Sequence, residues 1–399
     1  MKIYNEELLK NDLIANCGRP YQQCTISVMD TIADPDIRFD KNGICNYYTV
    51  YQHLRDSLVF EGDEGKIMLT KQIDLIKYES KGKKYDCILG LSGGIDSTYL
   101  ALLAKENGLN PLLVHFDYGW NLELAVQNIE NIVKTLGFDL YTIVMDWEEM
   151  KSLQRAYYKS SVLDLDVPAD HMIFGALYKT AVKFRIKYIL SGKNIVTEAI
   201  LPKTWNYEKF DLVNLKNINK QFENGTLKKL PKLGLWQFGY YKAVRQIKLV
   251  DLLNLVPYNK EEVKKRIATE LGWKDYGGKH YENIFTRFYQ GYILPVKFGI
   301  DKRKAHLSTL IFSQQLAKED AITILKNPPC DMEVVKNDFE YVSKKLGFSQ
   351  TEFLALIEQP NRTHEEFGTD KLQQSVYYTL FKIVSPVTKS VKYIKKLFK

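Results

Sequence analysis

Short apolar runs alternate with segments of helical spacing through the middle of the chain. Strand-length apolar runs lie at 85–91, 112–116, 140–145 and 188–190. Apolar residues recur at helical spacing over 98–107, 123–136, 148–158 and 170–184. This alternation predicts βαβ units. We therefore expect an α/β fold in which a parallel, doubly wound sheet carries helices on both faces.

The pattern changes on either side of this core and predicts three parts. Residues 1–80 would form a small N-terminal module, 81–310 the α/β domain and 311–399 a helical C-terminal region. Within the α/β domain, residues 201–248 interleave aromatic side chains with Lys and Arg, as in an insertion over the carboxyl edge of the sheet. Such a stretch either stacks on a sugar or base, or forms a lid packed on itself. In the C-terminal region, short amphipathic helices are expected at 319–325, 333–346 and 350–358.

The first predicted strand leads into Ser92-Gly93-Gly94-Ile95-Asp96-Ser97 and then into a helix. Such a turn gathers backbone N–H groups and the positive end of a helix dipole around one point, which suits a polyphosphate. The glycines let the backbone approach the anion, the two serines add hydroxyl donors, and Asp96 implies a divalent cation beside the phosphates. The alternative is an ordinary turn with Ser97 as the N-cap. The pattern lacks the Gly-Lys-Ser/Thr of a Walker A motif and resembles the PP-loop of the ATP pyrophosphatases, which split ATP between its α- and β-phosphates.

Two further polar loops follow predicted strands. Asp117 comes after 112–116, and Ser191-Gly192-Lys193-Asn194 comes after 188–190. Because ligands of such sheets lie off the carboxyl ends of the strands, both loops are compatible with the site at Ser92. Asp117 either accepts hydrogen bonds from a ribose or an adenine amino group, or caps a turn. The second loop resembles a later PP-loop element, with Gly192 near the α-phosphate and Lys193 either a phosphate ligand or a surface charge.

Composition narrows the class of protein. With 399 residues, 45% hydrophobic and 26% charged, the chain has the composition of a globular protein with more than one domain. The first residues lack the apolar region of a signal peptide, and no apolar run is long enough to span a membrane, so we expect a cytoplasmic protein. Five cysteines form an odd and sparse set, which fits a reducing compartment. Much of the net charge of +8 lies in the last 18 residues, so charge alone does not indicate nucleic acid binding.

Two cysteines in the N-terminal module sit in turn-like settings. Cys24 and Cys45 are spaced as in a zinc knuckle, but each would need a second cysteine three residues later. Those positions hold Ser27 and Tyr48, which are not ordinary zinc ligands. Cys17 and His53 lie near enough in sequence to substitute as ligands, but nothing in the spacing demands it. The pattern favours two buried thiols in a compact module without metal over a zinc site.

Basic residues also mark the distal third. Lys302, Arg303 and Lys304 stand in a row, which suits a diphosphate or a carboxylate, or else a solvated face. After Pro386, apolar residues at helical spacing alternate with lysines, which predicts a basic amphipathic helix. Such a helix is able to lie on an anionic membrane surface, so a peripheral location at the inner membrane face is open; docking on the rest of the chain or on a partner is as compatible.

Taken together, these motifs resemble the N-acetyl sugar amidotransferases of bacterial surface-glycan and flagellar-sugar synthesis. The resemblance covers about residues 20–360 and rests on the segments 28–31, 34–40, 43–46, 92–97, 285–288 and 297–308. Two departures from the family pattern stand out. Ser27 and Tyr48 replace the family's usual cysteines, and Gln314 and Gln315 stand where a glycine is expected.

The resemblance implies a PP-loop fold of the adenine nucleotide α-hydrolase-like type and conversion of an acetamido group to an acetamidino group on a nucleotide-activated sugar. ATP and Mg²⁺ would be required, with an O-adenylyl intermediate that ammonia displaces. The implied catalytic residues are Asp96, Ser97 and Lys193, with Asp96 also holding Mg²⁺. The implied ATP-binding residues are Leu91, Ser92, Gly93, Gly94, Asp96, Ser97, Asp117, Gly192 and Lys193. The implied substrate-binding residues are Arg287, Lys302, Arg303 and Lys304.

The family's usual pairing implies that a separate glutaminase supplies the ammonia, and no cysteine here sits in a nucleophile elbow. Two other functions stay open. A PP-loop enzyme acting on tRNA would bind RNA with a steep salt dependence. A nucleotide-binding scaffold would bind ATP without releasing AMP.

Overall fold

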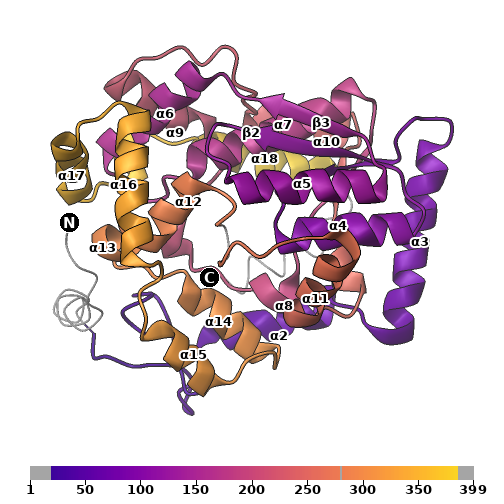
Figure 1. Cartoon of the computed structure of the whole chain (residues 1–399), viewed down its shortest axis with the longest axis horizontal. Coiled ribbons are helices and arrows are strands. Elements are labelled where there is room, and N and C mark those ends of the chain that lie inside the picture. Colours follow the sequence, from indigo (N-terminus) through magenta and orange to yellow (C-terminus); the bar gives the residue numbers. More distant parts are fainter. Residues whose placement is uncertain (1–18, 279–280, 385–399) are drawn as a thin grey trace.

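The computed structural model describes residues 19–278 and 281–384, and its centre is a five-stranded parallel sheet. The strand order is β3-β2-β1-β4-β5 (Figure 1). The strands are β1 (Cys87–Gly90), β2 (Pro111–Asp117), β3 (Leu140–Val144), β4 (Tyr188–Leu190) and β5 (Lys248–Val250). All neighbours pair in parallel, so the carboxyl ends of the strands meet at one edge of the sheet. The expected α/β fold with a doubly wound parallel sheet is confirmed.

Alternate residues of the central strands face different helix layers. Leu89 of β1 and Leu113 of β2 pack with α3 (Gly62–Ser80), α4 (Ile95–Glu106), α5 (Glu123–Leu136) and α11 (Lys260–Leu271). Their neighbours Ile88 and Leu112 pack with α6 (Trp147–Ser160) and α7 (Val167–Lys183) on the opposite face. Because side chains alternate along a strand, a sheet buried on both faces reads as an almost continuous apolar run.

The predicted helix and strand bounds agree closely with this core. The predicted helix 123–136 and strand 188–190 coincide with α5 and β4. Helix α4 begins three residues earlier than expected, at Ile95, because Gly94 with its extended backbone caps it. Strand β5 was not expected, since it has only three residues at the sheet edge and two of them are exposed.

The segment 201–248 packs against the α6 and α7 face. It contains η1 (Lys203–Trp205), α9 (Leu212–Phe222) and α10 (Leu235–Ala243). Trp205 is fully buried, and its indole N–H donates to the carbonyl of Ala33 at 2.5 Å. Trp236 and Tyr240 stay exposed. Most of the segment is therefore packed structure.

The N-terminal segment meets the distal part of the chain. Helix α2 (Asn46–Leu58) lies beside α14 (Arg303–Phe312), which in turn packs against α15 (Lys318–Leu325) (Figure 1). The backbone N–H of Val28 donates to the Ser308 hydroxyl at 3.3 Å, and Lys304 forms a buried ion pair with Asp30 at 2.5 Å. The first and last thirds of the sequence therefore share one packed interface.

The distal part is helical, as expected. It consists of α12 (Ile284–Phe288), the π-turn η3 (Tyr289–Ile293), α13 (Leu294–Phe298), α14, α15, α16 (Met332–Leu346), α17 (Gln350–Glu358), the short η4 (His364–Phe367) and α18 (Lys371–Val384). The three predicted helices correspond to α15, α16 and α17. The predicted basic helix after Pro386 and Cys17 lie outside the described residues.

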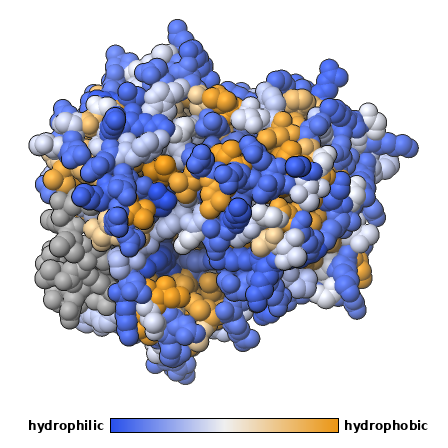
Figure 2. All heavy atoms as spheres, viewed as in Figure 1, coloured by the Kyte–Doolittle hydropathy of each residue, from blue (hydrophilic) through white to orange (hydrophobic). Residues whose placement is uncertain are grey.

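The surface is mainly hydrophilic on the face shown in Figure 2, with smaller hydrophobic areas between the hydrophilic residues. Among the residues that the structure describes, no helix combines the length and the apolar character needed to cross a bilayer.

Candidate active site

The loop from Leu91 to Ser97 joins β1 to α4 at the carboxyl edge of the sheet. The buried Leu91 extends the strand pairing, since its N–H donates to the carbonyl of Val114 at 2.8 Å. Gly93 then takes φ +82°, and a Cβ there would lie 2.8 Å from the carbonyl oxygen of Ala125. Only glycine suits this position. The indole N–H of Trp273 donates to the Gly93 carbonyl at 2.8 Å and holds the loop from the side.

The two serines of the loop face each other. Their hydroxyl oxygens are 3.3 Å apart, and the Gly94 N–H donates to the Ser92 hydroxyl at 3.2 Å. Ser97 lies in the first turn of α4, where the backbone N–H groups point outward and the helix dipole is positive. The hydroxyls and the helix start therefore have the arrangement that the sequence predicts for this turn, and binding of a polyphosphate there stays a prediction.

Asp96 is held by side chains from two other segments. Its Oδ1 accepts a hydrogen bond from the Asn194 amide at 3.0 Å and another from the Tyr258 hydroxyl. Burial and the Asp96 carboxylate raise the pKa of Tyr258 far above its ordinary value, so the phenol stays protonated and donates. Gly192 packs against this residue, since a Cβ there would be 3.5 Å from the Cβ of Asp96. The loop at 191–194 and the loop at 92–97 therefore form one site.

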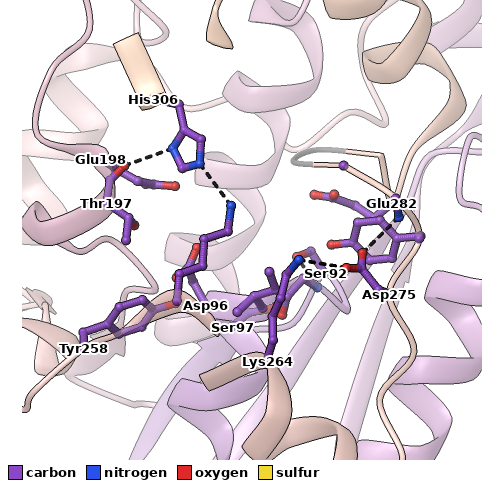
Figure 3. Close-up of a pocket in the computed structure, with 16 residues that line it drawn as sticks. Ser92, Asp96, Ser97, Thr197, Glu198, Tyr258, Lys264, Asp275, Glu282 and His306 are labelled. Carbon is purple, nitrogen blue, oxygen red and sulfur yellow. Dashed lines mark hydrogen bonds and ion pairs between the residues drawn. The ribbon is translucent and has the colours of Figure 1, made fainter. Parts of the chain in front are cut away.

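A cavity of about 310 Å³ opens over this loop (Figure 3). Beside the loop residues, it is lined by charged and polar side chains from α11, from the segments before and after α11, and from α14: Tyr258, Lys260, Lys264, Asp275, Tyr276, Glu282 and His306. Lys264 pairs with Asp275 at 2.8 Å. Burial works against the charged form of Asp275, but this ion pair and the N–H of Gly277 prevail and lower its pKa. The two lysines supply positive charge where a polyphosphate would bind.

His306 bridges two walls of the cavity. Its Nδ1 lies 3.1 Å from the carbonyl oxygen of Thr197, and its Nε2 lies 3.0 Å from Nζ of Lys260 (Figure 3). A carbonyl oxygen only accepts and an ammonium only donates, so the imidazole carries its hydrogen on Nδ1 and a lone pair on Nε2. This arrangement describes a neutral histidine with one fixed tautomer.

A second, larger cavity of about 640 Å³ adjoins the first. The two cavities share the lining residues Thr197, Glu198, Gly277, Gly278 and His306. The larger one is also lined by Lys193 and Lys302, by the ion-paired Arg303, and by an apolar set that comprises Ala199, Ile200, Leu201, Tyr281, Ala305, Ile324 and Pro329. Three basic residues that the sequence analysis assigned to the site, Lys193, Lys302 and Arg303, therefore border a partly apolar pocket beside the phosphate loop.

Two of the predicted substrate-binding cations have protein partners instead. Arg287 forms a bidentate ion pair with Asp338 at 2.7 and 2.8 Å. Lys304 is buried against Asp30. Neither lines the two cavities described above, and we therefore assign both to structural ion pairs. Lys193 stands apart from the loop cavity, on the side of the larger pocket.

Asp117 follows the alternative that the sequence left open. Its Oδ1 accepts from the Gly119 N–H at 2.9 Å, which is a capped turn at the end of β2. It is not among the residues that line either cavity. The position next to β1 is the predicted one, but a nucleotide contact by Asp117 stays a prediction.

Cys24 and Cys45 are buried side by side in the N-terminal segment. The Cys45 N–H donates to Sγ of Cys24 at 3.2 Å, and the Ser27 hydroxyl lies 3.8 Å from Sγ of Cys45. Hydrogen bonding by Cys45 lowers the pKa of Cys24 to about 5. Within residues 19–278 and 281–384, no group of three or more His, Cys, Asp or Glu side chains is placed to hold a metal. Two thiols and a hydroxyl do not make a zinc site of the ordinary kind.

The donor set at Asp96 suits Mg²⁺ bound with a nucleotide. Mg²⁺ prefers oxygen ligands and is usually held by one or two carboxylates together with substrate phosphates, so a complete protein cage is not needed. Tyr258 and Asn194 fix the orientation of the Asp96 carboxylate in the manner of outer-shell partners of a metal ligand. The loop and Asp96 therefore fit ATP with Mg²⁺.

Several lining residues were not assigned from the sequence. Tyr258, Lys260, Lys264 and Asp275 lie in a stretch without strand-end signals, and only the spacing of the two lysines, four residues apart on α11, places them on one face. His306 belongs to a segment used for the family resemblance but received no role. Gln314 takes φ +60°, the conformation for which a glycine was expected.

Comparisons with known proteins agree with this geometry. Residues 86–200 match the family described as "Queuosine biosynthesis protein QueC", and residues 282–383 match "LPS biosynthesis protein WbpG-like, C-terminal domain". The first match contains the phosphate loop and the turn at 191–194. The second contains Lys302 and His306.

Three curated relatives are similar to parts of the chain. An uncharacterized protein of Methanocaldococcus jannaschii is 26% identical over 67% of this chain and 82% of its own length. An NH(3)-dependent NAD(+) synthetase of Mycoplasmopsis pulmonis is 27% identical over 51% of this chain and 82% of its own length. A tRNA(Ile)-lysidine synthase of Chlamydia pneumoniae is 36% identical over 21% of this chain and 27% of its own length. With the phosphate loop, the parallel sheet and the two family matches in place, the chain is a PP-loop protein of the ATP pyrophosphatase family, of the WbpG type.

Proposed function

We propose that this protein converts the acetamido group of a nucleotide-activated sugar into an acetamidino group, with ATP split into AMP and pyrophosphate. The product would serve the synthesis of a bacterial surface glycan such as a lipopolysaccharide O-antigen, which the WbpG-like match supports. The observation that carries the proposal is the junction of the two cavities. The phosphate loop borders one, the WbpG-like segment borders both, and Thr197, Glu198 and His306 form the wall they share.

The larger cavity has the chemistry that such a substrate requires. Lys193 and Lys302 would attract the diphosphate of a nucleotide sugar. The apolar part, with Leu201 and Ile324, would cover the acetyl methyl group or the faces of the rings. An amide oxygen that enters from this side would approach a nucleotide held at the loop, because the two cavities share part of their lining.

The reaction needs two displacements. The amide oxygen attacks the α-phosphorus, and pyrophosphate leaves. Ammonia then adds to the acyl carbon of the O-adenylyl imidate, and AMP leaves with the former amide oxygen. Ser92, Ser97 and the start of α4 would hold the phosphates, while Asp96 would hold the Mg²⁺ that neutralises part of their charge. Catalysis of this kind consists mainly of positioning and charge stabilisation.

The ammonia would come from a separate glutaminase chain. A glutaminase site of the common kind needs an accessible cysteine nucleophile. Each of the four cysteines within the described residues, Cys24, Cys45, Cys87 and Cys330, is buried. Glutamine hydrolysis by the purified chain alone would contradict this part of the proposal.

The decisive experiment is mass spectrometry of a reaction with ATP, Mg²⁺, ammonium and a panel of UDP- and CMP-linked acetamido sugars. Replacement of oxygen by NH lowers the product mass by about one unit, and AMP should form in equal amount because each turnover splits one ATP. Matched controls are the omission of ammonium and the corresponding sugars without an acetamido group. Bound ATP without AMP in every arm would leave only a nucleotide-binding protein.

A tRNA substrate is the second candidate, supported by the partial match to a tRNA(Ile)-lysidine synthase. A tRNA arm belongs in the same experiment. Modification of tRNA, with binding that falls steeply as salt rises, would favour this candidate over the sugar.

A further inference from the structure

We propose that His306 is the general base that accepts the proton lost by ammonia as it adds to the adenylylated acyl carbon. The inference rests on the proposed amidotransferase function and names a residue for its second step. It concerns a side chain of the WbpG-like segment, which the structure brings to the phosphate loop of the other matched segment.

The first support is position. In a reaction between two bound substrates, the bonds form where their cavities meet. His306 lines both cavities and lies half-buried at their common wall. Figure 3 shows its ring beside Thr197 and Glu198, and its two nitrogens contact the Thr197 carbonyl and the Lys260 ammonium.

The second support is the protonation state. The Nδ1–H donates to the Thr197 carbonyl, so Nε2 keeps its lone pair and turns it toward Lys260. A general base must start without the proton that it will take, and its orientation must be fixed by a partner on the other ring nitrogen. Thr197 supplies that partner through its backbone, which a side-chain change at residue 197 cannot remove.

The third support is Lys260. Its ammonium donates to Nε2 of His306 and also borders the phosphate cavity. A polyphosphate at the loop offers this ammonium stronger, charged acceptors. Lys260 would turn to the phosphates when ATP binds, and Nε2 would then face the junction for the proton. Lys264 is less able than Lys260 to move to the phosphates, because it is paired with Asp275.

The proton balance requires one such acceptor. The amide nitrogen and ammonia together bring four hydrogens, and the amidinium product keeps three of them on its two nitrogens. One proton must therefore leave as the new C–N bond forms and the C–O bond to AMP breaks. Glu198 lines the same wall. In general an imidazole is better matched than a carboxylate to accept a proton near neutral pH.

The test separates the two steps of the reaction in His306→Asn and His306→Gln. Exchange of labelled pyrophosphate into ATP, with sugar and without ammonia, reports only the first step and should stay within about two-fold of the wild type. Ammonia-dependent product formation should fall by about 10²–10⁴-fold, the usual contribution of a general base. Lys260→Met is the matched comparison and should lose the exchange reaction, since it removes a phosphate ligand.

Hydroxylamine provides a second readout. It is less basic than ammonia, and its adduct gives up a proton more readily, so the His306 variants should lose much less rate with this nucleophile. Equal losses with both nucleophiles, a loss of exchange that parallels the loss of product, or a variant with normal ammonia-dependent turnover would each overturn the assignment. A structural role would produce one of the first two patterns.

If neither His306 variant folds, a measurement on the wild-type protein tests the assignment instead. A solvent deuterium isotope effect on the ammonia-dependent step, absent from pyrophosphate exchange and weaker with hydroxylamine, supports the assignment, and its absence refutes it. If the wild-type protein forms no AMP with any acetamido sugar, the proposed function has failed; if it forms product and the His306 pattern is absent, only this inference has failed.

Discussion

Lys302 and Lys304 are separated by one residue, but the same substitution should affect a different property of the protein at each position. Lys304 is buried, and its ammonium pairs with Asp30 at 2.5 Å, with side-chain exposures of 11% and 1%. Lys302 is half-buried, borders the larger cavity and lies 5.8 Å from the ring centre of Tyr289. Lys304→Met should therefore lower stability, and Lys302→Met should lower affinity for the sugar.

The loss of stability expected for Lys304→Met depends on the hydrogen bonds that Asp30 retains. Removal of one member of a buried pair usually costs about 3–5 kcal/mol, because a charge is left without its partner. The Oδ1 of Asp30 would still accept from the N–H groups of Ile32 and Ala33 at 3.1 and 2.7 Å. We therefore expect the lower end, about 3 kcal/mol, and a fall in Tm of roughly 3–6 °C for a protein of this size. For Lys302→Met we expect a loss of folding stability of about 1 kcal/mol or less.

Thermal unfolding followed by circular dichroism measures the first effect, and KM for the nucleotide sugar measures the second. A double-mutant cycle with Asp30→Asn isolates the coupling between Asp30 and Lys304, which should exceed 1 kcal/mol. A Lys304→Met protein with unchanged Tm and a raised KM would refute the structural role and return Lys304 to the substrate site. A Lys302→Met protein with unchanged KM would remove Lys302 from that site.

Three further outcomes follow from the site and from one buried carboxyl. Tyr258→Phe removes a donor to Asp96 and should raise the Mg²⁺ concentration needed for half-maximal pyrophosphate exchange by about 10-fold or more, with little change in Tm. Gly93→Ala should lower stability by at least about 1–2 kcal/mol because of its φ of +82°, whereas Gly192→Ala, which meets only ordinary contacts, should fold normally and weaken nucleotide binding in a filter assay. Burial and the neighbouring Asp211 raise the pKa of Asp370 to about 6. The folded state therefore holds a proton that the unfolded state has lost, and stability should fall as pH rises from about 4 to 6; Asp370→Asn should flatten that dependence in urea unfolding, and an unchanged profile would contradict it.

The sequence predicted those parts of the fold that depend on neighbours in the chain. The apolar runs of β1 and β2 and the amphipathic helix α5 carry the burial pattern in their own residues, and the loop at 92–97 carries its glycine where φ must be positive. Strand β5 was not predicted, because a mostly exposed three-residue edge strand has no apolar pattern to detect.

The roles of individual cations could not be predicted in the same way. Lys304 and Asp30 are 274 positions apart, and Arg287 and Asp338 are 51 apart, so the composition around each lysine or arginine says nothing about its partner. A row of three basic residues reads as one patch in the sequence. On the turn of a helix it splits, because successive side chains point in different directions.

The same geometry explains why the phosphate loop alone does not define this protein. Ser92 to Ser97 supply a site that PP-loop proteins share, and the matches to QueC and to an NAD(+) synthetase reflect it. What differs is the wall opposite the loop, where α14 of the WbpG-like segment places His306 at the smaller cavity and Lys302 beside the larger one. Since α14 is anchored to the N-terminal segment through Lys304 and Ser308, the position of that wall depends on an interface between segments almost 280 residues apart in the sequence.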